Sequence, residues 1–405
     1  MLNYEKIFAE RTRLMKASEI RQLLKWVSKG NVISFGGGMP DPKLFPKEEI
    51  AKITYQIISE QGEKALQYGP TEGIEIFRKE IFNFMHKENI KVKDADHIIV
   101  TSGSQQGLDI LGRILIDPGD VIIIELPTYL AAINAFKIYE PKLIGIPVDE
   151  EGIKTDILEK KVAELIRNGE KIKFIYTIPT CQNPTGLSMS LDRRKHLLEI
   201  ASKYDLLVVE DDPYSYFLYE PVKVTPLVTL DNEDRVLYVS TFSKILSPGL
   251  RLGWIAGEKQ IIEKISIAKQ SMDLCTSTLT QYIAAEALRQ GVIERHIPKV
   301  REVYRKKRDT MLKALEEYMP EGCRWARPIG GMFILAWTPE KIDTKKMLLK
   351  CIKKYKVAYV PGQSFYVDGS GTNTMRLNFT YPTVEQIDKG IQYLSEAIKE
   401  ELQSS

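Results

Sequence analysis

Residues 236–256 read VLYVSTFSKILSPGLRLGWIA, and this stretch indicates both the fold class and the chemistry of the chain. An apolar segment, Val236 to Ser240, leads into a loop of small and apolar residues, and a second apolar segment follows at Gly253 to Gly257. Short apolar runs bounded by turn residues are typical of buried strands. The loop between these two predicted strands carries a lysine, Lys244.

The same pattern of strand and loop recurs along the chain, with helical stretches between most of the strands. This alternation predicts an α/β fold with a mainly parallel, seven-stranded sheet that helices cover on both faces. The predicted strands are Ile98 to Val100, Val121 to Ile124, Leu143 to Val148, Ile172 to Ile178, Leu206 to Glu210, Val236 to Ser240 and Trp254 to Ala256.

The pattern changes in the last third of the chain. A long charged helix at about 298–317 precedes predicted strands at 333–337, 357–360 and 375–379. The final helix has Thr383 as a predicted N-cap and Gln386 three residues later, which is a capping-box pattern. We predict a large domain at 46–295 and a small domain at 296–405. Residues 1–45 would add an amphipathic helical arm and part of the small domain.

The composition excludes several classes of function. The 405 residues include 57 Lys+Arg and 54 Asp+Glu, so the net charge of +3 does not favour a nucleic-acid binder. The stretch before the first glycine-rich turn is also too short for an added winged-helix domain. The four histidines are far apart and match no metal-ligand spacing, so we expect no metal site.

The location of the protein is predicted from its cysteines and its apolar runs. The four cysteines form no CxxC pair, which is typical of reduced thiols in the cytoplasm. No apolar run approaches the roughly 20 residues of a membrane-spanning helix. The charged N-terminal stretch lacks the apolar region of a signal peptide. We therefore expect a cytoplasmic protein with no membrane partner.

Lys244 is a candidate nucleophile. In an apolar loop at a strand end, desolvation would lower the pKa of its amine and favour the neutral form that Schiff-base chemistry needs. Thr241, Ser243 and Arg251 supply hydroxyl groups and a guanidinium close by, which suit a phosphate. A solvated loop lysine beside a structural arginine is the simpler interpretation of the same residues.

Three further strand ends carry polar residues. Residues 101–107 read TSGSQQG before a helical pattern, with Ser104 as the predicted N-cap and Gln105 as the first helical residue of an anion site. Residues 209–214 read VEDDPY, in which Asp211 suits a protonated ring nitrogen and Tyr214 a phenolic oxygen. Residues 179–186 read PTCQNPTG, with a turn at Asn183. Taken singly, each stretch also fits an ordinary joint, a solvated acidic pair or a simple turn.

The four strand ends together predict one cofactor. In open α/β sheets, ligands bind beyond the carboxyl ends of the strands. A phosphate site, a partner for a ring nitrogen, donors to a phenolate and an imine-forming lysine are the groups that pyridoxal phosphate requires.

The chain resembles the class I aminotransferases of the fold-type I pyridoxal-phosphate enzymes, especially the subgroup of 2-aminoadipate, kynurenine and aromatic aminotransferases. The resemblance runs nearly end to end, and the order of the motifs makes it specific. The matching motifs are Ser18 to Arg21, Gly36 to Gly38, Gln67 to Gly69, Gly103 to Gln106, Asn183 to Gly186, Asp211 to Tyr214, Ser243-Lys244, Gly249 to Arg251 and Arg376 to Asn378.

The resemblance implies a large pyridoxal-phosphate-binding domain, a small domain formed by the two chain ends, and roles for the site residues. Lys244 would bind the aldehyde of the cofactor and shuttle a proton. Asp211 would pair with the ring nitrogen, Asn183 and Tyr214 would bind the ring oxygen, and Tyr129 would stack on the ring. The residues implied for the phosphate are Ser104, Gln105, Thr241, Ser243, Arg251 and, from the second subunit of a homodimer with shared sites, Tyr68. The simpler interpretations of Tyr129 and Tyr68 are a core aromatic and a helix cap.

The resemblance also implies how the substrates bind. Arg376 would hold the α-carboxylate with the help of Gly38 and Asn183, and a planar guanidinium suits a carboxylate. Ser18 and Arg21 match a helix that recognises the distal carboxylate in relatives that act on 2-aminoadipate, although Arg21 also fits the polar face of an amphipathic helix.

The implied activity is a ping-pong amino transfer from a broad-range or aromatic L-amino acid, or from 2-aminoadipate, to 2-oxoglutarate. The open alternatives are a pyridoxal-phosphate-dependent β-elimination lyase and a non-catalytic relative that binds the cofactor. Two positions depart from the pattern of the family. Thr241 stands where serine is frequent, and Cys181 stands where an aromatic residue is frequent.

Overall fold

The seven strands predicted between residues 98 and 256 all lie in one large sheet of the computed structural model, which describes residues 2–15 and 32–404. A further strand of two residues, which the sequence did not indicate, pairs at the edge of this sheet. The strands are β2 (Ile98–Thr101), β3 (Val121–Leu126), β4 (Lys142–Asp149), β5 (Gly152–Ile153), β6 (Ile172–Thr177), β7 (Leu207–Asp211), β8 (Val236–Thr241) and β9 (Gly253–Ala256).

The order of the strands explains where a site forms. The sheet runs β2-β9-β8-β7-β6-β3-β4-β5, and the five neighbours from β8 to β4 are parallel. β9 is antiparallel to both β8 and β2, so β2 points the same way as the parallel strands. The carboxyl ends of β2, β8, β7, β6 and β3 therefore meet at one edge, where open α/β sheets bind ligands.

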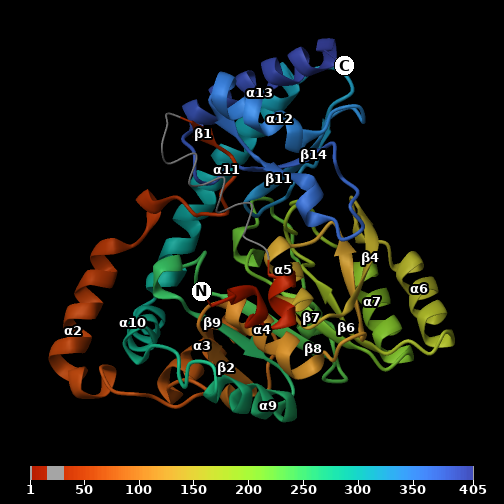
Figure 1. The fold of residues 1–405 in the computed structure, drawn as a ribbon. Helices are drawn as coiled ribbons and strands as arrows, with labels where there is room; N and C mark the ends of the chain where they lie inside the picture. The colour runs from red at the N-terminus through yellow and green to blue at the C-terminus, as the bar shows by residue number, and fades with distance from the viewer. Residues whose placement is uncertain (1, 16–31, 405) are drawn as a thin grey trace.

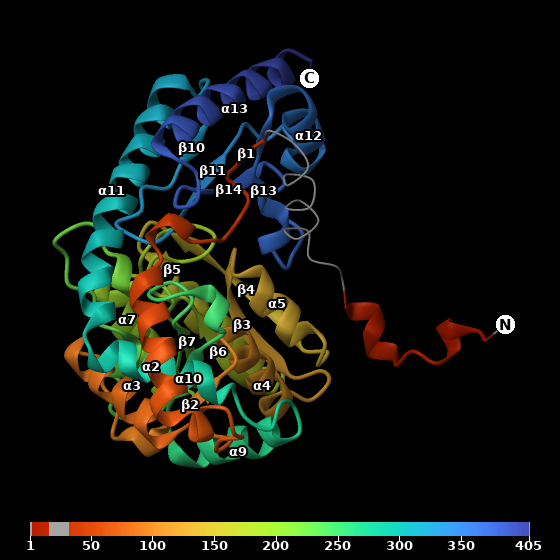
Figure 2. The ribbon, with the colours of Figure 1, turned by 90° about the vertical axis from the view of Figure 1, so that its left-hand side faces the viewer.

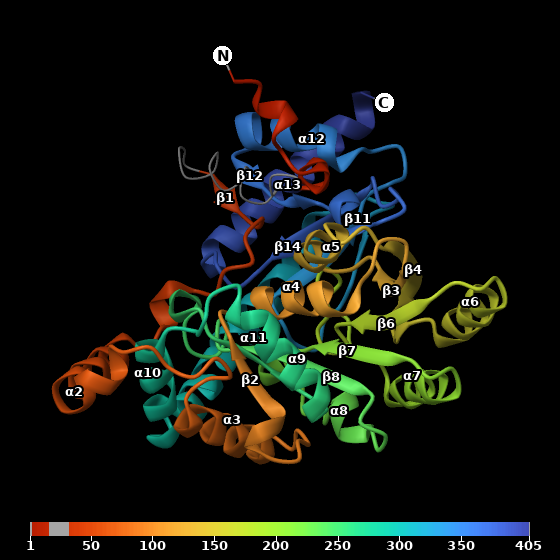
Figure 3. The ribbon, with the colours of Figure 1, turned by 60° about the horizontal axis from the view of Figure 1, so that its bottom comes forward.

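Helices cover both faces of the large sheet, as predicted. Apolar side chains of α4, α5 and α9 pack on one face, and those of α3, α6, α7 and α10 pack on the other. Figure 3 shows α4 and α5 on the opposite side of β6 to β8 from α7 and α8. The helices are α2 (Lys47–Ala65), α3 (Glu75–Lys87), α4 (Ser104–Leu115), α5 (Leu130–Lys137), α6 (Thr155–Arg167), α7 (Leu191–Lys203), α8 (Leu227–Leu230), α9 (Lys259–Gln270) and α10 (Thr278–Arg289).

The two chain ends form a smaller unit next to the large sheet (Figure 1). Its four-stranded antiparallel sheet has the order β10-β11-β14-β13, and β1 pairs with β12 in parallel. The pairing of β1 with β12 places residues from both ends of the chain in one layer. The elements are β1 (Ile33–Ser34), α11 (Val292–Tyr318), β10 (Arg324–Trp325), β11 (Phe333–Trp337), α12 (Thr344–Lys350), β12 (Val357–Ala358), β13 (Val360–Pro361), β14 (Thr374–Asn378) and α13 (Val384–Ser404).

Two predictions of secondary structure in this unit were wrong. The long helix, predicted at about 298–317, begins at Val292 and continues through Pro298. The predicted strand at 357–360 is two strands in different sheets, divided at Tyr359, whose hydroxyl donates to the carbonyl of Thr344. The capping box is confirmed, since Thr383 and Gln386 exchange hydrogen bonds between side chain and backbone at 3.0 and 3.3 Å.

The described N-terminal residues lie apart from the rest of the chain. Figure 2 shows the short 3-10 turns at Tyr4–Lys6 and Glu10–Leu14 away from both units. The helical arm predicted around Ile20 to Val27 lies outside the described residues. The division at 45/46 and 295/296 stays a prediction, and α11 continues across the second boundary. Within the described residues, no helix combines the length and apolar character needed to cross a membrane.

Candidate active site

The predicted site residues that follow β2, β6, β7 and β8 lie at the carboxyl-terminal edge of the large sheet. Thr101, Thr177, Asp211 and Thr241 are the last residues of these strands, and all four are at most 3% exposed. In each case the loop beyond the strand carries the predicted groups. Buried strand ends hold these loops in place, so the edge is a rigid support for a ligand.

Lys244 lies in the loop between β8 and β9. Phe242 and Ile245, which flank Ser243 and Lys244, are fully buried in the same apolar core and anchor the loop there. The amine of Lys244 donates to the carbonyl of Gly38 at 2.8 Å. Burial, helped by the charges of Arg376 and Arg251, lowers the pKa of the Lys244 amine to about 8. The predicted desolvation of this lysine therefore agrees with its surroundings, and a neutral amine is accessible near physiological pH.

An anion cradle forms where β2 meets α4. Gly103, with φ of 79°, is the N-cap and Ser104 the first helical residue, so the predicted assignment of Ser104 as N-cap was wrong by one position. A side chain at Gly103 would overlap the guanidinium of Arg251. Because the first backbone N–H groups of a helix have no partner inside it, Ser104 and Gln105 can present theirs to an anion.

Hydroxyl groups from the loop after β8 complete the cradle. The hydroxyls of Thr241 and Ser243 hydrogen-bond at 2.9 Å, and Arg251 Nη1 lies 3.5 Å from Ser243 Oγ. Arg251 Nη2 donates to the carbonyl of Ser102 at 3.2 Å. The guanidinium of Arg251 thus contacts both the loop after β8 and the turn before α4.

A polar chain of contacts runs from Tyr214 to Arg376. The side chain of Asn183 lies near the phenol of Tyr214, and its oxygen accepts a hydrogen bond from Arg376 Nη1 at 2.9 Å. The other terminal guanidinium nitrogen of Arg376, Nη2, donates to the carbonyl of Gly36 at 3.1 Å. This series of polar contacts links the loops after β6 and β7 to β14 of the small unit, so the site lies between the two units.

Arg376 is a buried cation whose guanidinium lies close to two aromatic rings. It is 1% exposed, and its guanidinium carbon is 4.1 Å from the ring centre of Phe333 and 5.2 Å from that of Phe365. Within residues 2–15 and 32–404, no carboxylate forms an ion pair with Arg376, and its Nε has no hydrogen-bond partner. A buried charge without a counter-ion is costly, so this arrangement favours an anionic ligand.

Comparison with known proteins identifies the family. A family profile described as aminotransferase class I and II matches residues 31–394. The chain belongs to the class I and II aminotransferases. It is 52% identical to aromatic-amino-acid aminotransferase 1 of Thermococcus litoralis over 99% of this chain and 96% of the relative.

Solved structures of aminotransferases agree with this assignment. The chain superposes with a TM-score of 0.95 on kynurenine aminotransferase of Pyrococcus horikoshii, solved with PMP, at 50% identity and 98% coverage of both chains. The TM-score is 0.92 for α-aminoadipate aminotransferase of Thermus thermophilus, solved with N-(5'-phosphopyridoxyl)-L-leucine, at 36% identity and full coverage of both. This aminotransferase therefore has the predicted fold-type I architecture, and its cofactor is pyridoxal 5'-phosphate.

The buried side chains of the aminotransferase fit that cofactor. Asp211 is 2% exposed, and its Oδ1 has no hydrogen-bond partner among the described residues. Burial raises the pKa of the Asp211 carboxyl to about 7. An unpaired buried carboxylate oxygen matches a protonated ring nitrogen, which would supply both the missing hydrogen bond and a compensating charge.

The remaining predicted residues differ in their positions. Tyr129 precedes α5 and is close enough to Asp211, Arg376 and Arg251 for their charges to affect its pKa. The side chain of Tyr68 is 78% exposed and makes no hydrogen bond to a site residue within the described chain. The predicted substrate residues Ser18 and Arg21 lie outside the described residues. Within the described part of the chain, no group of three or more metal-ligating residues occurs.

Sequence reasoning missed Glu125, a buried carboxylate that holds the loop after β6. Glu125 accepts from the hydroxyl of Thr177 at 2.6 Å, the N–H of Ile178 at 3.1 Å and the side chain of Gln182 at 3.1 Å. Burial raises the pKa of this carboxyl to about 7. These contacts fix the loop that carries Asn183. An acidic residue inside the apolar run of β3 was the available signal.

Two other features could not be found from the pattern. Phe333 and Phe365 contact Arg376 from positions far away in the sequence, and aromatic residues at such positions are ordinary in a core. Cys181 is fully buried, with its sulfur within hydrogen-bonding distance of the Ser188 hydroxyl. A side chain added at Gly330 would come within 2.9 Å of this sulfur. Cys181 thus packs against the turn before β11.

Proposed function

We propose that this aminotransferase moves the amino group of a large L-amino acid, aromatic or 2-aminoadipate, to 2-oxoglutarate in two half-reactions. The names of the relatives support this range of donors. The observation that carries the proposal is the buried amine of Lys244. Burial and two nearby guanidinium groups lower the pKa of this amine to about 8. The amine lies at the sheet edge that also holds an anion cradle and an unpaired carboxylate oxygen.

Lys244 would do the proton transfer. When bound, pyridoxal phosphate supplies an aldehyde that receives the amino group and a ring that draws electrons from the α carbon of the substrate. Nζ of Lys244 would take the proton from that α carbon and deliver it to C4′, the former aldehyde carbon of the cofactor. In the second half-reaction Nζ would move a proton in the opposite direction. A base with a pKa near the working pH suits both directions of this transfer.

Other residues of the chain would hold the cofactor in place. The carboxylate of Asp211 would keep the ring nitrogen protonated, because a buried negative charge stabilises a nearby cation. Asn183 and Tyr214 would donate to the ring oxygen, and Tyr129 would cover the face of the ring. The proposed phosphate ligands are Ser104, Gln105, Thr241, Ser243 and Arg251.

Arg376 would bind the α-carboxylate of the substrate. Its Nη1 already lies 2.9 Å from Asn183, so the same amide would connect the cofactor and substrate sites. The backbone N–H of Gly38 would give a second hydrogen bond to the carboxylate. Phe333 and Phe365 restrict the guanidinium plane, so its free edge is fixed before a substrate arrives.

A panel of half-reactions tests the proposal. The enzyme loaded with pyridoxal phosphate is mixed with phenylalanine, kynurenine, 2-aminoadipate, glutamate or alanine, without an oxo acid, and the loss of the aldehyde absorbance is followed. We expect fast conversion with the first four and slow conversion with alanine. Addition of 2-oxoglutarate should then restore the starting spectrum.

The same panel separates the alternatives. No change with any amino acid would refute the transaminase function, and a preference for alanine would refute the proposed donors. Release of ammonia in place of amino transfer would indicate a lyase. Lys244→Ala serves as the control, since it removes the reactive amine.

We further propose that Arg21, with Ser18, recognises the distal carboxylate of dicarboxylic substrates and leaves space when an aromatic side chain binds. Arg21→Ala should lower kcat/KM for glutamate and 2-aminoadipate by about 10- to 100-fold, the cost of one hydrogen-bonded charge pair. Phenylalanine is the internal control, because it has no distal carboxylate. An unchanged ratio of glutamate to phenylalanine would refute this role.

We propose that two copies of the chain form a dimer and that Tyr68 reaches the phosphate in the partner's site. The support is an exposed apolar surface on α2 and just beyond it. Tyr55, Ile58, Leu66 and Tyr68 are between 44% and 78% exposed. Several large apolar side chains exposed on one segment are typical of an interaction surface. The isolated N-terminal turns also expose Tyr4 and Phe8, which suits contact with a second copy (Figure 2).

Mixed dimers test this sharing of sites. Lys244→Ala and Tyr68→Phe subunits are purified with different tags, dissociated, mixed and isolated as heterodimers. If Tyr68 serves the other subunit, each heterodimer regains one intact site and its activity exceeds that of both parents. Activity no higher than that of the Tyr68→Phe parent would place Tyr68 in its own subunit's site, and a monomer by light scattering would refute the dimer.

A further inference from the structure

The two oxygens of the Asp211 carboxylate have different surroundings. Oδ2 accepts a hydrogen bond of 2.7 Å from the hydroxyl of Tyr176. Oδ1 is buried and has no hydrogen-bond partner among the described residues. The site therefore fixes one oxygen of this carboxylate and leaves the other available.

Sheet register places Tyr176 where it can do this. Tyr176 on β6 lies beside Val209 on the parallel neighbour β7. Side chains two residues apart on a strand share a face, so Asp211 projects from the same face as Val209. On that face, the ring of Phe136 from α5 meets the Tyr176 ring edge-on, with 5.5 Å between the ring centres. Tyr176 is fully buried, and this packing limits where its hydroxyl can point.

We propose that Tyr176 is a positioning residue for Asp211. Its hydroxyl donates to Oδ2, turns Oδ1 toward the place of the cofactor's ring nitrogen, and stabilises the ionised carboxylate. The proposal rests on the role of Asp211 proposed above. It adds a group that touches neither the cofactor nor the substrate and acts only through Asp211.

The electrostatics of the site support a distinct contribution from Tyr176. Burial raises the pKa of Asp211 to about 7, the charge of Asp212 raises it as well, and the hydrogen bond from Tyr176 opposes both. Tyr129 and Tyr214 also face Asp211, and burial together with the negative charge of Asp211 raises the pKa of both phenols, so they stay neutral. Loss of the Tyr176 hydroxyl would thus move Asp211 toward its protonated form at neutral pH.

The chain offers a matched control for a test of this role. Tyr238 on β8 is also fully buried, and its hydroxyl donates to Asp212 Oδ2 at 3.0 Å. Asp212 follows Asp211, so alternation points its side chain to the opposite face of the sheet. Tyr176→Phe and Tyr238→Phe each remove one buried hydrogen bond from tyrosine to aspartate, but only the first touches Asp211.

The first measurement uses the protein without cofactor. The carboxylic-acid band of Asp211, assigned in difference infrared spectra with Asp211→Asn, is titrated in each variant. Tyr176→Phe should raise the midpoint by about one pH unit, equivalent to the loss of one hydrogen bond to a charged group. Tyr238→Phe should leave the midpoint unchanged or lower it, because any loss of charge on Asp212 removes an effect that raises the pKa of Asp211. Equal midpoints in Tyr176→Phe and the parent protein would overturn the proposal.

The second measurement is the dissociation constant of pyridoxal phosphate at pH 7. Tyr176→Phe should weaken binding about tenfold in the parent protein and less than twofold in Asp211→Asn, where the ionised carboxylate is already gone. An equal effect in both backgrounds would show that Tyr176 acts independently of Asp211. Asp211→Asn with unchanged affinity and spectrum would refute the proposed role of Asp211 itself, so the two failures are distinguishable.

A second variant covers the case in which Tyr176→Phe does not fold. Incorporation of 3-fluorotyrosine at position 176 retains the ring and makes the phenol a stronger donor. The Asp211 midpoint should then move down, opposite to the shift expected for Tyr176→Phe. No shift, or an upward shift, would overturn the proposal.

Discussion

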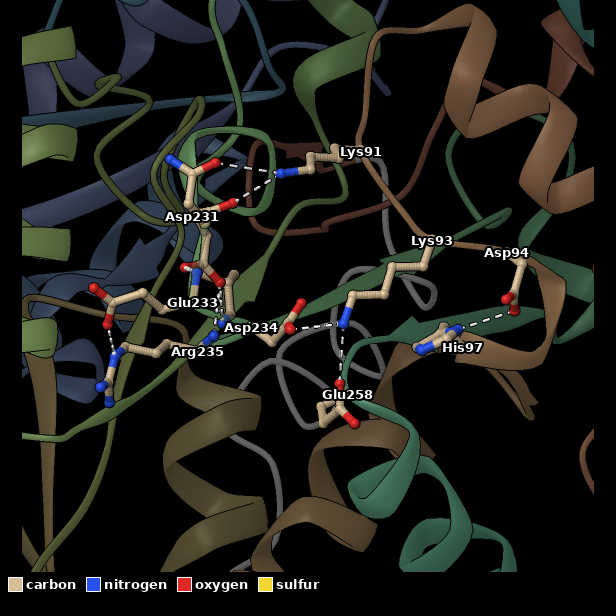
Figure 4. A network of polar contacts seen from close by, with 11 residues as sticks. Lys91, Lys93, Asp94, His97, Asp231, Glu233, Asp234, Arg235 and Glu258 are labelled. Atoms are coloured by element: carbon tan, nitrogen blue, oxygen red, sulfur yellow. Dashed lines mark hydrogen bonds and ion pairs between the residues drawn. The ribbon is translucent and has the colours of Figure 1, made fainter.

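At the amino-terminal edge of the large sheet, Lys93 pairs with Asp234 at 2.6 Å and with Glu258 at 3.4 Å (Figure 4). At the carboxyl-terminal edge, by contrast, Arg376 has no carboxylate partner within the described chain. The paired charges are exposed, with Lys93 and Asp234 half accessible to solvent. The unpaired charge is 1% exposed. At the amino-terminal edge, water and counter-ions compensate the exposed charges. At the carboxyl-terminal edge, only a bound anionic ligand can compensate the buried charge of Arg376.

The contrast extends to neighbouring residues at both edges. Before β8, Arg235 pairs with Asp205 at 2.7 Å and with Glu233 at 2.5 Å. Beyond the other end of the same strand, burial and nearby guanidinium groups destabilise the charged form of Lys244. The two ends of this strand therefore differ in how their charged side chains are solvated and paired.

The largest expected difference between the two edges is in catalysis. Lys244→Ala should abolish the absorbance band of the covalently bound cofactor. It should also lower kcat by at least about 10⁴-fold, since it removes both a nucleophile and a general base. Lys93→Ala, the matched control at the opposite edge, should keep both kcat and the spectrum. The two rates and spectra are compared at one pH. Activity retained in Lys244→Ala would refute the assignment of the site.

A second comparison concerns two arginines. Arg376→Lys keeps the charge but loses the planar fork, so kcat/KM should fall by about 10- to 100-fold through loss of a charge-assisted hydrogen bond. Steady-state kinetics with 2-oxoglutarate as acceptor measure the change. Arg235→Lys is the control and should have parental kinetics, because its partners are exposed carboxylates. Equal kinetics in the two variants would contradict the role of Arg376.

The pH dependence of cofactor capture gives a third comparison. Only the neutral amine attacks an aldehyde, so capture of pyridoxal phosphate by the apoenzyme should rise about tenfold per pH unit below the Lys244 pKa and level off above it. The expected bend is at about pH 8, since burial, Arg376 and Arg251 lower the pKa from 10.5. Stopped-flow absorbance measures the rates. A rise that continues toward pH 10 would indicate an ordinary exposed lysine.

Much of this contrast could be predicted from the sequence, because strand ends can be recognised locally. Apolar runs that end in polar loops indicated Lys244 and Asp211 as candidate site residues and placed a turn at Asn183, and their assignment to one site remains a prediction. Tyr176 could not be identified in this way. A tyrosine inside an apolar strand is an ordinary core residue until the order and register of the strands place it beside Asp211.

The fold showed the same limit. The seven main strands were predicted from their apolar runs, but the division of 357–360 between two sheets depends on pairing with β1 and β14, which are distant in the sequence. The shift of the α4 N-cap to Gly103 depends on a positive φ and on contact with Arg251. Long-range packing decided each of these features, and no local pattern records it.

The smallest expected effects are on stability, and there the two edges should differ in sign. At pH 7 the protonated form of Lys244 is destabilised in the folded apoenzyme, because its folded pKa lies below its unfolded value. This cost is complete below about pH 8 and disappears as the pH rises toward 10.5. Lys244→Met should therefore leave the free energy of unfolding of the apoenzyme unchanged or raise it by up to about 1 kcal/mol. Lys93→Met breaks an exposed pair and should lower it by at most about 1 kcal/mol.

Urea denaturation of the two apoprotein variants at pH 7 and at pH 10 measures both effects. Any gain from Lys244→Met should shrink at pH 10, since the parental amine is then neutral in the folded state and less protonated in the unfolded state. The loss from Lys93→Met should shrink with added salt, which screens an exposed pair. Destabilisation of several kcal/mol by Lys244→Met would contradict the contrast, because it would mean that the amine stabilises the fold through a contact that its function does not require.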